Sequence, residues 1–159
     1  MSTNLSNNFT WEEFIYSDTA NSRGIDNNPP KEIEEEIKLK ASNLCNHLLQ
    51  PIRNVLGPII ISSGYSCTAL AKVLGRKENS QHNKGEAADL CFKNIDNLTA
   101  AKWIRKNCSF DQLIYEKRMR KNGTTYDWVH VSYKSEKHNR QEVLYSPIGG
   151  GYQHGLPLK

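Results

Sequence analysis

The stretch Ser80-Gln81-His82-Asn83-Lys84-Gly85-Glu86-Ala87-Ala88-Asp89 places an imidazole and a carboxylate seven positions apart across a glycine. Residues 86–92 are predicted to form a strand, and period-two alternation puts Asp89 on a face with small neighbours that leave room for an ion. Because glycine permits a sharp turn, Gly85 lets His82 swing back over the same face. The stretch therefore predicts a metal site on a strand.

A third ligand is expected from the second strand-like run, Tyr126-Asp127-Trp128-Val129-His130-Val131-Ser132-Tyr133. Its His130 lies between two valines, a core position that needs a polar partner. Two imidazoles and one carboxylate leave a fourth tetrahedral position open, as catalytic zinc sites require. We therefore expect one Zn²⁺ per chain, held by His82, Asp89 and His130. The alternative for His82 is a solvated loop histidine.

These motifs carry a resemblance to a known family. Ser-x-His-x-x-Gly-x-Ala-x-Asp, followed by Asp-x-x-His inside Trp-Val-His-Val-Ser, resembles the zinc D-Ala-D-Ala carboxypeptidases of bacteria and phages. That family includes phage endolysins that cut the L-Ala-D-Glu bond, and hedgehog domains share its fold. Residues 9–30, 61–65 and 110–114 also look like the family's stretches. The resemblance implies a zinc peptidase acting on the peptide stems of peptidoglycan.

The resemblance also implies that Asp127, three positions before His130, is the general base that accepts a proton from water. Plain alternation puts Asp127 and His130 on opposite faces of a strand. The role therefore requires a bend or bulge at the start of the strand. The alternative is a turn carboxylate that caps the hairpin.

One position departs from the family. Where relatives often carry an arginine directly after Ser-Gly-Tyr, this chain has Ser66. A neutral hydroxyl cannot give charged, bidentate contacts to an oxyanion or a carboxylate. Lys72, Arg76 and Lys77 are the nearby candidates to replace that charge. The alternative is a zinc-binding module of the same fold that is weakly active or inactive.

Further site residues are predicted around these ligands. Tyr65 is a candidate for lining a substrate cleft, with core packing as the alternative. Ser80 and Gln112 are candidates for hydrogen bonds that orient the ligands. Glu116 shares a strand face with Gln112, and we interpret it first as a solvent-facing charge and only second as a group near the metal.

Bulk composition narrows the class of protein. With 159 residues, the chain is long enough for one domain with its own core. The formal net charge of +4 is mildly basic, and the cluster at residues 117–121 has no aromatic platform or basic helix beside it, so nucleic acid is not expected as a partner. The four cysteines lack C-x-x-C spacing and are expected to be buried free thiols.

The expected partner is the peptide stem of peptidoglycan, with no nucleic acid and no membrane, and we expect a monomer. Nothing at the N-terminus resembles a signal peptide, so we expect synthesis in the cytoplasm and action on the cell wall, as for an endolysin released at lysis. No apolar run approaches the length of a membrane span.

The pattern along the chain predicts an α+β fold, a single domain with a mainly antiparallel sheet and packed helices, like that of the carboxypeptidases and hedgehog domains. We expect a flexible N-terminus over residues 1–8, the peptidase domain over 9–147 and a flexible tail over 148–159. The helix predicted over residues 31–56 is expected to kink or break near Leu48 because of Pro51. Helices are predicted at 11–16, 68–74 and 97–107, a loop at 18–30, and strands at 58–62, 86–92, 111–117, 126–133 and 142–145.

Overall fold

The computed structural model describes residues 3–158. Its helical elements are α1 (Trp11–Ile15), α2 (Asp18–Ser22), α3 (Lys31–Leu44), the π-helix η1 (Cys45–Leu49), α4 (Gln50–Leu56), α5 (Thr68–Val73), the 3₁₀ helix η2 (Gln81–Lys84) and α6 (Asn97–Asn107). Its strands are β1 (Ile59–Ser63), β2 (Ala87–Phe92), β3 (Gln112–Met119), β4 (Thr125–Ser132), β5 (Glu142–Ser146) and β6 (Gln153–His154).

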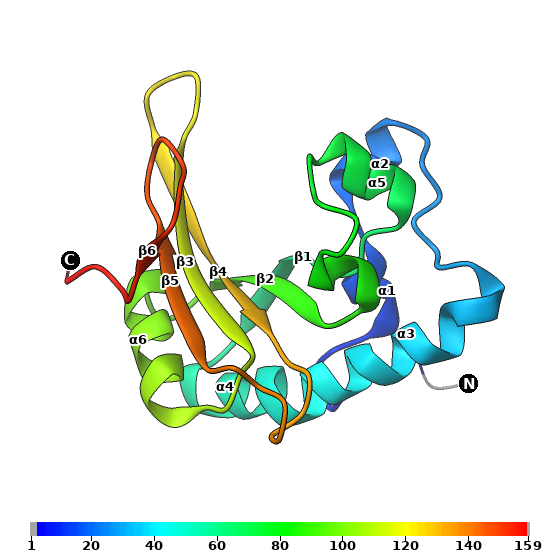
Figure 1. The fold of residues 1–159 in the computed structure, drawn as a ribbon, viewed down its shortest axis with the longest axis horizontal. Helices are drawn as coiled ribbons and strands as arrows, with labels where there is room; N and C mark the ends of the chain where they lie inside the picture. Colours follow the sequence, from blue (N-terminus) through cyan, green and yellow to red (C-terminus); the bar gives the residue numbers. More distant parts are fainter. Residues whose placement is uncertain (1–2, 159) are drawn as a thin grey trace.

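The strands form a six-stranded sheet in the order β1-β2-β4-β3-β5-β6. All neighbours are antiparallel except β3 and β5, which run parallel. Figure 1 shows the sheet with the β3–β4 hairpin projecting from it and with α1, α2 and α5 grouped on the other side of the molecule. The predicted α+β domain with a mainly antiparallel sheet is confirmed.

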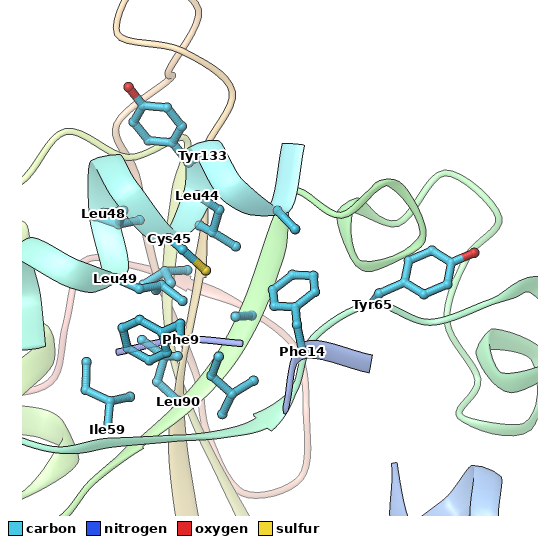
Figure 2. Packing of buried hydrophobic residues seen from close by; sticks show 14 of the residues in the cluster. Phe9, Phe14, Leu44, Cys45, Leu48, Leu49, Ile59, Tyr65, Leu90 and Tyr133 are labelled. Carbon is cyan, nitrogen blue, oxygen red and sulfur yellow. The ribbon is translucent and has the colours of Figure 1, made fainter. Parts of the chain in front are cut away.

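One face of the sheet builds the hydrophobic core. The register pairs Leu113 with Val131 and Leu90 with Val129, and side chains of paired residues share a face. These residues belong to the same buried cluster as Leu44 and Leu48 of the α3–η1 segment, as Figure 2 shows for Leu44, Leu48 and Leu90. The core thus lies between this face and the helices, and alternate residues of the same strands are left for the other face.

The predicted interruption of the long helix is a π-helical segment rather than a break. Residues 31–56 continue from α3 through η1 into α4, and Pro51 lies in the first turn of α4. A proline lacks the backbone N–H and clashes with the carbonyl one turn earlier. The wider turn of η1 relieves that clash while the chain stays helical.

The predicted loop over residues 18–30 contains the short helix α2. Ser17 starts it, because its hydroxyl accepts a hydrogen bond from the backbone N–H of Ala20 at 3.1 Å. Over five residues, alternation and helical periodicity carry too little signal to predict this helix from the sequence. Thr10 caps α1 in the same way, by accepting a hydrogen bond from the N–H of Glu13.

Both end segments carry structure in their described parts. Asn4 pairs with Thr10 in an isolated β-bridge, and Leu5 is buried. At the other end β6 pairs with β5, and Lys102 donates a hydrogen bond to the carbonyl of Leu158 at 2.7 Å. Residues 1–2 and 159, part of the segments expected to be flexible, lie outside the described residues.

The cysteines agree only in part with the prediction of buried free thiols. The four cysteines are free thiols, but only Cys45 and Cys67 are buried, while Cys91 and Cys108 are half-buried. Among residues 3–158, no helix combines the length and the apolar character that crossing a membrane requires.

Candidate metal centre

His82 is held in the site by a short helix and a backbone carbonyl. Ser80 caps η2 by accepting from the N–H of His82, and Gly85 ends η2 with a positive φ of 77°. The ring Nδ1 lies 2.8 Å from the carbonyl oxygen of Gly64, and the side chain is almost fully buried. Because a carbonyl oxygen can only accept a hydrogen bond, Nδ1 carries the proton. The lone pair of Nε2 is therefore left for a metal ion.

Asp89 and His130 meet across the β2–β4 pair. They are direct partners in the register, and Nδ1 of His130 lies 3.0 Å from Oδ1 of Asp89. The same carboxylate oxygen lies 3.4 Å from Nε2 of His82. Ligand atoms of these three buried residues all lie within 4.8 Å of one another. The predicted convergence of two imidazoles and one carboxylate is therefore confirmed.

The protonation states suit a metal. Burial lowers the pKa of His82, which favours the neutral imidazole that metals bind. Burial alone would raise the pKa of Asp89, but the neighbouring imidazoles of His82 and His130 bring that pKa below its ordinary value. Two neutral imidazoles and one carboxylate are the donor set of a catalytic zinc site, and these residues fit that ion.

The positive charge of the site comes from Arg76. One of its terminal nitrogens, Nη2, lies 3.0 Å from the hydroxyl of Ser63 and 3.3 Å from Oδ2 of Asp89. The other, Nη1, donates to the hydroxyl of Ser66. Of the three candidates for replacing the family arginine, Arg76 is the one that contacts Asp89, and Ser66 is its hydrogen-bond partner.

Asp127 is not brought to the metal ligands. The β3–β4 register runs without a bulge from Gln112 opposite Ser132 to Met119 opposite Thr125. The bend that the general-base prediction requires is therefore absent from this pair of strands. The Asp127 carboxylate instead accepts hydrogen bonds from Asn97 at 2.8 Å and from the hydroxyl of Tyr115, a core residue. It lies on the helix-covered face, opposite His130.

Glu116 lies on the sheet face of His130, opposite the face that carries Asp127. It pairs with Trp128, two residues from His130 on the same face of the hairpin, and its side chain is only 12% exposed. Burial and the charge of Asp89 raise the pKa of Glu116, while His130 and Arg118 oppose that rise. The interpretation of Glu116 as a solvent-facing charge is wrong. Its alternation with Gln112 and Ile114 was the signal that places it on the sheet face of His130.

The remaining predicted residues have identifiable partners. Tyr65 is 4% exposed and belongs to the hydrophobic cluster, at whose margin Figure 2 places it. Ser80 acts as the cap of η2 and thereby orients His82, as predicted for a hydrogen-bonding group. Gln112 donates to Glu142 across the parallel β3–β5 pair at 2.6 Å, which is a contact between strands rather than with the ligands.

The structure is thus an α+β domain whose sheet carries a buried His-Asp-His group that could hold a metal ion. A family model described as Peptidase M15 matches residues 7–132, most of the chain. The chain belongs to the Peptidase M15 family, and the resemblance to zinc D-Ala-D-Ala carboxypeptidases is confirmed. A comparison with curated proteins found no match.

Proposed function

We propose that this chain is a zinc peptidase that hydrolyses bonds in the peptide stems of bacterial peptidoglycan. The observation that carries the proposal is the buried His82–Asp89–His130 group in a member of the Peptidase M15 family. Both D-Ala-D-Ala and L-Ala-D-Glu bonds are candidates, and the second would make the protein a phage endolysin acting on the wall from inside the host.

His82, Asp89 and His130 would hold the zinc. When bound, zinc in such a site makes water a nucleophile at neutral pH and polarises the carbonyl under attack. The protein supplies the proton transfers around that step. A carboxylate close to the attacking water accepts its proton and later donates it to the leaving amine.

Glu116 is our candidate for this base, in place of Asp127. It shares the sheet face of His130, whereas the Asp127 carboxylate is engaged by Asn97 and Tyr115. A pKa raised by burial suits a carboxylate that must both accept and return a proton near neutral pH.

The alternative function is a zinc-binding module without catalysis. Ser66 favours it, because the hydroxyl lacks the charge of the family arginine. The contacts of Arg76 with Ser66 and Asp89 oppose it, since they bring a guanidinium to the same place.

The experiment measures the release of new amino groups from purified peptidoglycan, with mass spectrometry of the muropeptides to identify the bond. We expect zinc-dependent release that Glu116→Gln lowers by about 10²–10⁴-fold in kcat. Asp127→Asn is the matched carboxylate control and is expected to affect stability more than kcat. Loss of activity in Asp127→Asn with activity kept in Glu116→Gln would return the role to Asp127. No zinc-dependent release from any stem chemistry would support the binding module.

A further inference from the structure

Arg76 is a largely buried cation at the wall of the metal centre. It follows α5 in the loop that leads to η2, and its side chain is 18% exposed. Burial lowers the pKa of Arg76, while the charges of Asp89 and Glu116 raise it. A guanidinium remains charged at any working pH, so its burial is stable only next to such carboxylates.

The two carboxylate oxygens of Asp89 contact different partners. Oδ1 faces the imidazoles of His82 and His130, at 3.4 and 3.0 Å. Oδ2 faces Nη2 of Arg76 at 3.3 Å. A carboxylate held in this way cannot rotate freely about its Cβ–Cγ bond, so one oxygen is presented to a metal and the other is kept from it.

Two serines fix the guanidinium in turn. Ser63, the partner of Asp89 in the β1–β2 register, accepts from Nη2 at 3.0 Å, and Ser66 accepts from Nη1. Ser66 is fully buried, so a larger side chain there would occupy the space that Arg76 now fills. The small residue at position 66 and the arginine at position 76 are therefore complementary.

We propose that Arg76 is a positioning residue that holds Asp89 in single-oxygen ligation, with Ser66 as its seat. The inference rests on the proposed function only in taking zinc as the ion. It means that the loop after α5, which supplies no metal ligand, contributes to metal affinity through Arg76.

The test is zinc affinity, measured by competition with a chromogenic chelator, together with the visible spectrum of the Co²⁺-substituted protein. Arg76→Gln is expected to weaken zinc binding by about 10–100-fold, the usual effect of losing a group that orients a ligand. The Co²⁺ spectrum is expected to change because the carboxylate can then offer both oxygens. Lys77→Gln changes the neighbouring, exposed cation; it is the matched control and is expected to bind zinc like the unchanged chain.

Two further variants keep the test decisive if Arg76→Gln does not fold. Arg76→Lys retains the buried charge but cannot contact both serines and Asp89 at once, so weaker zinc binding is expected. The double variant Ser66→Arg/Arg76→Ser moves the guanidinium back to position 66 and is expected to bind zinc more tightly than Arg76→Ser alone. Unchanged affinity and an unchanged Co²⁺ spectrum in Arg76→Lys, or a double variant no tighter than Arg76→Ser, would overturn the inference.

Failure of the inference is distinguishable from failure of the proposed function. If the unchanged chain binds zinc but releases no amino groups, the peptidase proposal fails while the affinities still test Arg76. If it hydrolyses stems and the Arg76 variants bind zinc normally, only the positioning role is lost.

Discussion

Replacing Gly64 with alanine is expected to damage both the fold and the metal centre. Gly64 is the one glycine of the ten that does not have a positive φ, so the reason for it is space. A Cβ at this position would lie 2.2 Å from the carbonyl oxygen of Phe14, where real Cβ contacts stay beyond 3.0 Å. Because the obstacle is backbone, one of the two segments must move by close to an ångström.

The same peptide orients His82, which ties the two effects together. The Gly64 carbonyl is 2.8 Å from Nδ1 of His82, and a shift of that size weakens or breaks this hydrogen bond. Forced overpacking costs about 1–3 kcal/mol. Loss of the partner that orients a histidine ligand weakens metal binding by about 10–100-fold.

Urea denaturation of the metal-free protein measures the first effect of Gly64→Ala, and zinc competition measures the second. Gly123→Ala at the hairpin tip is the control, because nothing lies within 4 Å of its added Cβ and only its φ of +87° is unfavourable. We expect Gly123→Ala to cost about 1–2 kcal/mol and to leave zinc affinity unchanged. A Gly64→Ala protein with normal stability and normal zinc affinity would refute this account of His82.

Three further predictions concern stability. Asn27→Ala removes hydrogen bonds to the carbonyls of Ile15 and Tyr65 and from the N–H of Cys67, and is expected to cost about 3 kcal/mol in urea denaturation; a loss close to zero would contradict it. Chelation is expected to lower the melting temperature, since zinc at 100 times its Kd adds about 2.7 kcal/mol to the free energy of unfolding, and equal melting curves with and without chelator would argue against a zinc site. Glu116 has a folded pKa above its unfolded value of 4.5, so the folded state binds the proton more tightly and the metal-free protein loses stability as pH rises through that interval. Glu116→Gln is therefore expected to be more stable than the unchanged chain at pH values above the folded pKa of Glu116, and not more stable below pH 4.5. Urea denaturation at one pH on each side of this range measures the difference.

The ligand group was predictable because its information is local. Alternation along residues 86–92 placed Asp89 on one face, and the turn at Gly85 returned His82 to it, so two short stretches specified most of the geometry. The third ligand needed only the assumption that the two strands pair, which their register satisfies.

The general base and the cation Arg76 were harder to predict than the ligands, because their positions depend on tertiary structure. Alternation already placed Asp127 opposite His130, and the resemblance led us to expect a bulge that the β3–β4 register does not contain. Arg76 lies ten positions after Ser66, and only the length of α5 and the path of the following loop bring its guanidinium back to that hydroxyl. No periodicity in the sequence encodes such a return.

The parallel β3–β5 pair also exceeded what local pattern specifies. β4 ends beside the start of β3, where Ser132 pairs with Gln112, and residues 133–141 lead the chain past that end to Glu142 on the other side of β3. β3 and β5 therefore start at the same end of the sheet and run parallel. The prediction of a mainly antiparallel sheet held because this is one pair among five.

Along β4, His130 of the metal site lies between core residues that point to the other face of the sheet. This alternation limits where the hairpin can accept insertions and deletions. A slip of one residue would turn His130 toward the helices and send Val129 and Val131 to the opposite face, so that the His-Asp-His group and the core would be lost together. Length changes are therefore admissible only at the tip between Met119 and Thr125, beyond the last paired residues. Variation among natural descendants of this chain should gather there.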